Sequence, residues 1–95
     1  MSRITKSAEM EECLVRIHGA CNFRPETTVF AHLGGAGMGI KQPDYAGSYC
    51  CSTCHDVIDG RIQTSHSHQQ LKLWHLQGVI RTQAVLVDKG LLKIA

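Results

Sequence analysis

The sequence predicts a small α+β domain made of two short strands, a short helix and a longer carboxyl-terminal helix. The chain has 95 residues, the size of one compact domain whose core alone is marginally stable. Its amino-terminal half carries β-branched runs, whereas its carboxyl-terminal half repeats apolar residues at helical spacing. Hydrophobic residues make up 43% and aromatic residues 5%, which is typical of a globular chain with few large core side chains. We therefore expect one domain over residues 1–95.

The two strands are expected at residues 13–17 and 27–33, after a polar and loosely ordered lead-in over 1–12. Both runs are rich in β-branched residues, and turn-forming residues lie between them. This arrangement predicts a hairpin between the two runs. Residues 34–49 contain several glycines and a proline, so a loop is expected there.

The two helices are expected at residues 52–59 and 67–88, because Gly60 and Gly90 stand where helices commonly end. In the longer helix, apolar residues recur every three or four positions. This spacing predicts that one face packs against the sheet through Leu73, Leu76, Ile80, Ala84 and Val87. Residues 91–94 are expected to add a short terminal strand.

Cysteine spacing predicts a structural zinc site. The chain has five cysteines, an odd number, and closely spaced thiols in a reducing compartment more often hold metal than form disulfides. Cys51 and Cys54 form a C-x-x-C pair, and Cys13 and Cys21 form a wider pair upstream. Two such pairs converge on one tetrahedral Zn²⁺ in four-thiolate sites. Zinc bound by these four cysteines would supply folding free energy to a short chain.

Other roles for the cysteines follow less directly from the spacing. Cys13 or Cys21 could be an ordinary buried thiol, and Cys50 could replace Cys51 as a ligand. The C-x-x-C-H string also matches the c-type haem attachment pattern, but no export signal is visible. A thioredoxin-like redox role would need a βαβ pattern around the C-x-x-C pair, and the surrounding sequence does not have one.

Three polar side chains predict a hydrolytic metal site. His55 and Asp59 are four residues apart on the expected short helix, so both project from one face and could bind one divalent ion. Imidazole with carboxylate suits Mg²⁺, Mn²⁺, Ni²⁺ or Zn²⁺. His32 ends the second expected strand, where its imidazole could act as general base on a water. The alternative is structural, with His32 a hydrogen-bonded strand residue and the helix pair a solvated surface.

The residues that carry these motifs resemble known nucleases. Ala31-His32-Leu33, a glycine-rich loop and the Cys51 to His55 knuckle are similar to the ββα-metal fold of HNH endonucleases. A wider set of matches, over roughly residues 10 to 90, resembles the small prophage-encoded YbcO family of nucleases. These matches include Cys21-Asn22, Pro25 to Thr28, Gly37-Met38-Gly39, Lys41, Pro43-Asp44 and Asp56 to Arg61.

The resemblance implies a ββα-metal (HNH-like) domain that is stabilised by zinc and has an additional C-terminal helix. It also implies that the domain acts as a metal-dependent endonuclease on nucleic acid, with DNA as the expected substrate. It implies that His32 is the general base and His55 a ligand of the catalytic divalent ion. Lys41 and Arg61 are the basic residues expected beside the scissile phosphate. HNH proteins usually carry a metal ligand where this chain has Ala31. Either Asp59 supplies that ligand, or the chain is an inactive zinc-stabilised module that binds nucleic acid or protein.

Charge and hydropathy add little to this hypothesis. The formal net charge of +2 is too small to indicate nucleic-acid binding by itself. No apolar run is long enough for a membrane span and no secretory signal is visible, so we expect a cytoplasmic protein of a phage or prophage host. His66 and His68, at the start of the longer helix, could form an accessory metal site or a solvated polar cap.

Overall fold

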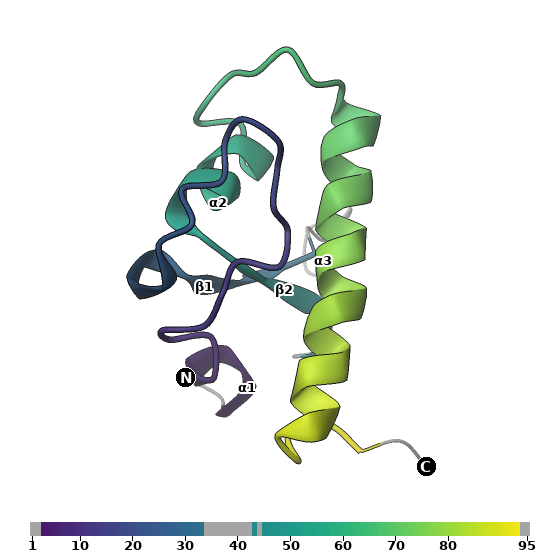
Figure 1. Cartoon of the computed structure of the whole chain (residues 1–95). Helices are drawn as coiled ribbons and strands as arrows, with labels where there is room; N and C mark the ends of the chain where they lie inside the picture. The colour runs from purple at the N-terminus through teal and green to yellow at the C-terminus, as the bar shows by residue number, and fades with distance from the viewer. Residues whose placement is uncertain (1–2, 34–42, 44, 94–95) are drawn as a thin grey trace.

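The computed structural model describes residues 3–33, 43 and 45–93, so Lys41 and Asp44 lie outside the described residues. Figure 1 shows a two-stranded sheet beside one long helix, with a short helix following the second strand. The elements in chain order are α1 (Arg3–Lys6), the 3-10 turn η1 (Pro25–Thr27), β1 (Val29–His32), β2 (Gly47–Cys50), α2 (Ser52–Ile58) and α3 (His68–Asp88). The predicted α+β class with a carboxyl-terminal helix is confirmed.

The sheet consists of β1 and β2, which pair antiparallel with Phe30 opposite Tyr49. A two-stranded sheet is marginal in water unless other elements pack against it. Both backbone groups of Tyr49 bond outside the sheet. The Tyr49 N–H donates to the Thr82 hydroxyl at 2.9 Å, and the Tyr49 carbonyl accepts from the Leu14 N–H at 2.8 Å. α3 and the segment around Leu14 thus close the outer edge of β2.

The hairpin partner differs from the one that the sequence predicts. β1 lies within the expected strand 27–33, but it pairs with residues 47–50, inside the expected loop 34–49, and not with residues 13–17. Residues 13–17 are bends and coil, because Arg16 has a φ of 55°, which an extended strand does not accommodate. Most of their apolar side chains are buried all the same, which explains the strand-like pattern.

Two clusters of buried apolar side chains lie on opposite faces of the sheet. The first contains Ala31 together with the cysteines, and the second contains Phe30. Neighbouring residues on a strand point to opposite faces, so these two side chains assign one cluster to each face. α3 joins both clusters, since Trp74 packs on the first and Leu86 belongs to the second.

α2 begins at the predicted residue and ends one residue early, with Asp59 as its C-cap. Cys51 is the N-cap, and its sulfur accepts a hydrogen bond from the Cys54 N–H at 3.4 Å. Gly60 follows with a φ of 82°, a left-handed conformation that glycine adopts without strain. These local signals set the bounds of the helix whose first turn contains the C-x-x-C pair.

α3 begins one residue after the predicted start, with Ser67 as N-cap, and ends at the predicted residue, but its buried face differs from the prediction. Leu73, Leu76 and Ile80 are 48%, 38% and 69% exposed, Ala84 is exposed and Val87 is half-buried. The predicted apolar face is therefore wrong, and the buried residues of α3 are His75, Gly78, Val79, Thr82 and Leu86.

The cause is a close approach between α3 and the segment 13–17. A Cβ atom added at Gly78 would lie 2.8 Å from the Val15 side chain and 3.1 Å from its Cα atom. Backbones this close leave no room for a leucine or isoleucine, so small and polar residues form the interface. Leu73, Leu76 and Ile80 instead lie on the exposed side of α3.

The two ends of the described chain also differ from the prediction. Part of the expected loosely ordered lead-in packs against the core, through Ile4 and Ala8. Ala8 is buried, and the Ser7 hydroxyl lies 2.8 Å from the Tyr49 hydroxyl. Residues 91–93 form bends and coil, so the described part of the expected terminal strand is absent. None of the helices in the described ranges combines the length and hydropathy that a membrane crossing requires.

Candidate metal centre and histidine site

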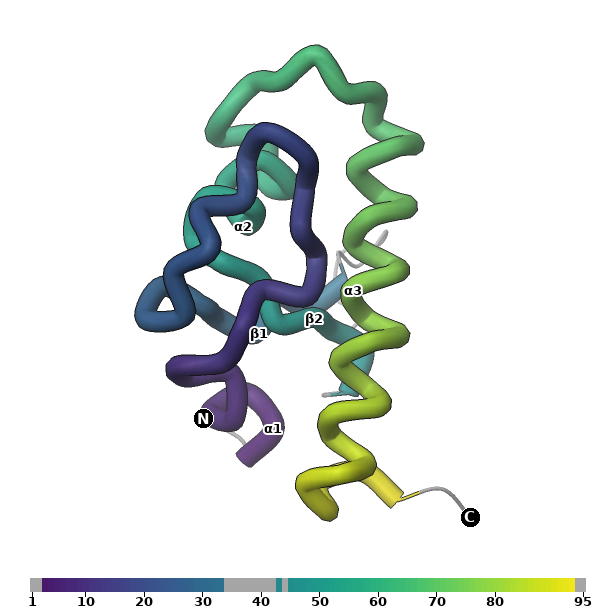
Figure 2. The backbone as a smooth tube through the Cα atoms, viewed as in Figure 1, coloured from purple at the N-terminus to yellow at the C-terminus, as the bar shows by residue number. Residues whose placement is uncertain are grey.

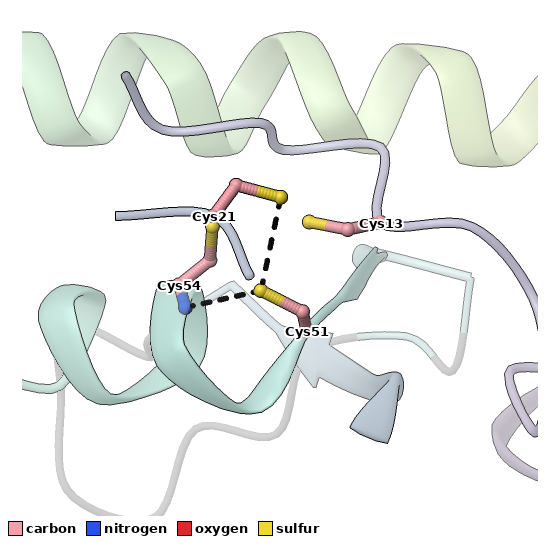
Figure 3. A group of neighbouring side chains, drawn as sticks. All are labelled: Cys13, Cys21, Cys51 and Cys54. Carbon is pink, nitrogen blue, oxygen red and sulfur yellow. Dashed lines mark hydrogen bonds between the residues drawn. The ribbon is translucent and has the colours of Figure 1, made fainter. Parts of the chain in front are cut away.

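Four cysteines from separate parts of the chain converge beside the start of α2 (Figure 3). The sulfur atoms of Cys13, Cys21, Cys51 and Cys54 all lie within 4.8 Å of one another, and only Cys21 is not fully buried. This is the quartet that the spacing predicts, and Cys50 does not belong to it. The four sulfur atoms could hold a metal ion.

The donor set fits a tetrahedral ion such as zinc. Zn–S bonds of about 2.3 Å place sulfur atoms about 3.8 Å apart in a tetrahedron. The sulfur atoms of Cys21 and Cys51 are 3.9 Å apart, and all five cysteines are free thiols. The Cys51 sulfur also accepts a hydrogen bond from the Cys54 N–H, which fixes its position at the start of α2.

The thiols of the cluster shift one another's pKa. Hydrogen bonds from the Cys50 and Cys54 thiols hold the pKa of Cys13 well below its ordinary range. The same contacts with Cys13 raise the pKa of Cys50 and of Cys54, whereas burial raises the pKa of Cys21 to about 11. A bound cation would favour deprotonation of all four ligands.

Asn22 ties the segment that carries Cys21 to the start of α2. Its Nδ2 lies 3.2 Å from the Ser52 hydroxyl and 3.1 Å from the Thr53 hydroxyl, and its Oδ1 accepts from the Arg24 N–H at 2.8 Å. Figure 2 shows this part of the chain running beside α2. The sequence indicates Asn22 only as a turn residue, because nothing in the spacing reveals contacts over thirty residues.

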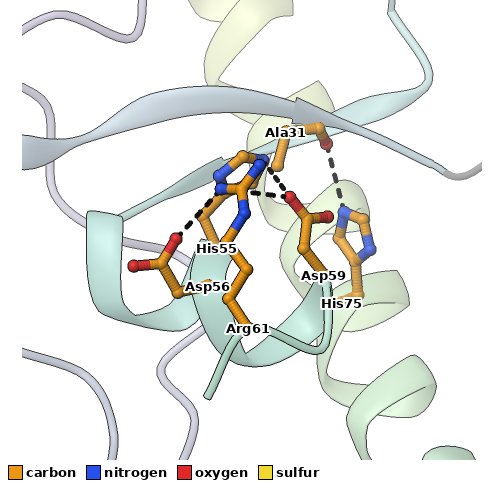
Figure 4. A network of polar contacts seen from close by, with 6 residues as sticks. All are labelled: Ala31, His55, Asp56, Asp59, Arg61 and His75. Carbon is orange, nitrogen blue, oxygen red and sulfur yellow. Dashed lines mark hydrogen bonds and ion pairs between the residues drawn. The ribbon is translucent and has the colours of Figure 1, made fainter.

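α2 also presents the predicted pair of His55 and Asp59 on one face (Figure 4). His55 Nε2 lies 3.5 Å from Asp59 Oδ2, and the side chains are 32% and 39% exposed. Arg61 reaches both carboxylates of this region, at 3.2 Å from Asp56 Oδ1 and 3.7 Å from Asp59 Oδ2. The pair is thus accessible from solvent and has a cationic side chain beside it.

Ala31 and His32 occupy opposite faces of β1. Ala31 faces α2, since it belongs to the same cluster as Val57. His32 is exposed at the end of the strand, and its ring lies edge-on to Phe30 with 4.9 Å between centroids. The structure therefore brings His55 and Asp59 together and leaves His32 on the other face of the strand end.

His75 is a site residue that the sequence does not indicate. It is 4% exposed, and its Nε2 donates a hydrogen bond to the Ala31 carbonyl at 3.1 Å. Burial lowers the pKa of His75, although the carbonyl and the nearby Asp59 act in the opposite direction. A search for apolar periodicity passes over His75, because its face of α3 also contains Gly78 and Thr82.

The remaining candidates lie apart from both sites or outside the described residues. His66 Nε2 contacts the His18 carbonyl at 2.9 Å, and its ring lies edge-on to Trp74. His68 is the exposed first residue of α3. Neither histidine joins a metal-binding group in the part of the chain that the structure describes. Lys41 lies outside that part.

The geometry defines a small α+β protein with a four-cysteine centre and an accessible histidine–carboxylate pair on the following helix. A family model described as "Putative nuclease YbcO" matches residues 2–91. The chain therefore belongs to the YbcO family, whose name indicates a nuclease and hence a nucleic-acid substrate.

Individual proteins agree with this assignment. The chain is 41% identical over 96 residues to "Putative nuclease YbcO" of Escherichia coli (strain K12), with 98% of this chain and 99% of that protein covered. The same values hold for "Putative nuclease ybcO" of Enterobacteria phage 82. A solved structure, "Structure of a putative bacteriophage protein from Escherichia coli str. K-12 substr. MG1655", is similar with a TM-score of 0.78. It is 39% identical, and the match covers 92% of this chain and 99% of that one.

Proposed function

We propose that this protein is a metal-dependent endonuclease that hydrolyses phosphodiester bonds in DNA on an HNH-like ββα scaffold. One observation carries the proposal. The antiparallel pair β1 and β2 leads directly into α2, and α2 presents His55 and Asp59 with 3.5 Å between a ring nitrogen and a carboxylate oxygen. Ligand atoms at this separation can share one divalent ion. The nuclease names of the relatives support the same class.

Each side chain of the site has a role in this proposal. His55 and Asp59 bind the divalent ion, which can be Mg²⁺, Mn²⁺, Ni²⁺ or Zn²⁺. A bound ion would stabilise the negative charge that develops on the phosphate and on the leaving oxygen. His32 accepts a proton from the attacking water as general base. Arg61 and Lys41 bind the phosphate backbone, as cationic side chains do in nucleic-acid complexes.

The cysteine quartet has a structural role in this proposal. Zn²⁺ bound by the four thiolates holds the segment with Cys13 and Cys21 against the start of α2. That contact fixes the helix that presents His55 and Asp59. We further propose that residues 1–95 act as one domain in the cytoplasm of a phage or prophage host, consistent with a relative from a phage.

A second candidate function is a zinc-stabilised module that binds nucleic acid or protein without cleaving it. Two observations favour it. Ala31 offers only a methyl group on the strand face that meets α2, and His32 lies on the opposite face against Phe30. For His32 to act as general base, the substrate phosphate would have to lie at the end of β1, where His32 is exposed.

The test is a nicking assay on supercoiled plasmid DNA with Mg²⁺, Mn²⁺, Ni²⁺ or Zn²⁺ added to the zinc-loaded protein. We expect nicking by the parent protein with at least one of these ions. His55→Ala and His32→Ala should each slow it by about a hundredfold or more, the usual effect of losing a general base or a group at a metal.

His18→Ala is the matched control, because His18 is an exposed histidine without a role in the proposed site. It should cut like the parent. No nicking with any ion, or equal nicking by the parent, His32→Ala and His55→Ala, would favour the binding module instead.

A further inference from the structure

An open cavity of about 660 Å³ lies between α2, the connection that follows it and the first turns of α3. Its apolar wall comes from three segments of the chain and consists of Leu33, Val57, Ile58, Ile62, Leu71 and Leu76. Cavities of this size accommodate a small molecule or one unit of a larger ligand. The cysteine quartet and the pair of His55 and Asp59 do not line it.

The polar side of the cavity is neutral to basic. Its polar lining residues within the described ranges include no carboxylate, and they are Gln63, Thr64, His66, His68, Lys72 and His75. His75 Nε2 donates to the Ala31 carbonyl, so the neutral ring carries no proton on Nδ1, which can accept a hydrogen bond. Apolar walls, a lysine and several imidazoles together complement a flat base that carries a phosphate.

The cavity adjoins the proposed ion site. Ile58 and Gly60 line it, and Asp59 stands between them in the chain. On the other side, His75 connects the cavity to the Ala31 carbonyl of β1 (Figure 4). A ligand in the cavity would therefore lie beside a phosphate bound at His55 and Asp59.

We propose that this cavity receives one unpaired nucleotide of the DNA substrate, next to the bond that is cut. The inference rests on the proposed function for the position of the scissile phosphate. A base inside a continuous duplex stays stacked and paired, whereas an unpaired base leaves the stack at a smaller cost. The protein therefore prefers DNA with an unpaired nucleotide over a continuous duplex, through contacts that a paired base cannot make.

Binding can be measured separately from cleavage. The probes are a fluorescein-labelled DNA duplex and the same duplex with a one-nucleotide bulge. They are titrated with zinc-loaded protein, without further divalent ions, and followed by fluorescence anisotropy. We expect the bulged duplex to bind about tenfold more tightly, because only its unpaired base can enter the cavity. Equal affinity for the two duplexes, or no binding to either, would overturn the proposal.

A matched pair of variants assigns the preference to the cavity. Leu76 and Leu73 are both partly exposed on α3, but only Leu76 lines the cavity. Leu76→Trp should fill the cavity and lower the affinity for the bulged duplex to that for the continuous duplex. Leu73→Trp should keep the preference, and its loss in both variants would contradict the assignment.

Lys72 provides a second test that adds no bulk. Lys72→Gln should weaken binding of the bulged duplex more than binding of the continuous duplex. Lys93→Gln, at an exposed lysine outside the cavity, should affect both equally. Equal effects of Lys72→Gln on the two duplexes would count against a phosphate beside the cavity.

Failure of this inference is distinguishable from failure of the proposed function. A protein that nicks plasmid but binds both duplexes equally is a nuclease whose cavity has another role. If the protein prefers the bulged duplex but cuts DNA with none of the four ions, the cavity assignment holds and the proposed nuclease function is wrong.

Discussion

The cysteine quartet and the histidine–carboxylate pair are neighbours on α2, but they are built in different ways. The quartet collects side chains from segments thirty residues apart, and three of its four members are buried. The pair consists of His55 and Asp59 on one helix, each about one-third exposed. Buried ligands from distant segments determine the fold, whereas an exposed local pair depends on a fold that already exists. The two regions should therefore respond differently to substitution.

The largest effect is expected from removing one ligand of the quartet. Structural zinc sites contribute on the order of 10 kcal/mol, which is comparable to the whole stability of a small domain. Cys54→Ser should therefore lose both bound zinc and the cooperative thermal transition. Zinc analysis and circular dichroism melting of the purified protein measure the two properties.

Cys50→Ser is the control for this experiment. Cys50 is as buried as Cys54 and hydrogen bonds to Cys13, but it stands outside the quartet. It should retain about one zinc per chain and melt cooperatively. A folded and zinc-free Cys54→Ser would show that the quartet does not hold the fold together.

The next effect is on activity alone and tests the exposed pair. Asp59→Asn removes the charge of a proposed ligand, and we expect the nicking rate to fall by about a hundredfold with an unchanged melting temperature. Asp56→Asn is the control, because Asp56 also contacts Arg61 but lies outside the pair. It should change the rate only a few fold. Comparable losses in both variants would assign the effect to Arg61 and not to an ion at Asp59.

A smaller effect is expected where α3 holds the strand that leads to Cys51. The buried Thr82 hydroxyl accepts the Tyr49 N–H at 2.9 Å, and Thr82→Val would leave this backbone donor without a partner. The cost should be about 1–3 kcal/mol of unfolding free energy, measured by urea denaturation of the zinc-loaded protein. Thr82→Ser keeps the hydroxyl and should lose less. A loss in Thr82→Ser that equals or exceeds the loss in Thr82→Val would mean that packing of the methyl group matters at least as much as the hydrogen bond.

Sequence patterns predict the parts of this molecule that depend on local signals. Gly60, Ser67 and the C-x-x-C pair mark helix ends through backbone conformation and capping, so α2 and α3 lie close to their expected bounds. The hairpin is different, because the partner of β1 is chosen by packing. Residues 13–17 have a strand-like composition, but the φ of Arg16 and the approach of α3 exclude them from the sheet.

The same distinction applies to the site. The quartet and the pair follow from spacing, because cysteines in pairs and residues four apart on a helix have few arrangements available. His75 and Asn22 act through side-chain hydrogen bonds to distant segments, and one sequence contains no signal for such contacts. The face of β1 from which His32 projects likewise depends on the register with β2.

The smallest expected effect is a pH dependence that comes from His75. Burial lowers its pKa from the ordinary value of 6.5, so the unfolded chain takes up a proton that the folded protein does not bind. Stability contributed by the neutral ring is present above pH 6.5 and is lost as the pH falls below it. His75→Gln can still donate to the Ala31 carbonyl but cannot titrate. Between about pH 7.5 and about pH 5.5, the parent should lose about 1 kcal/mol more unfolding free energy than the variant. Urea denaturation at both pH values measures this difference, and acid effects on the cysteine quartet cancel because both proteins contain it. Equal losses would mean that His75 takes up a proton in the folded protein as readily as in the unfolded chain, so that burial does not lower its pKa.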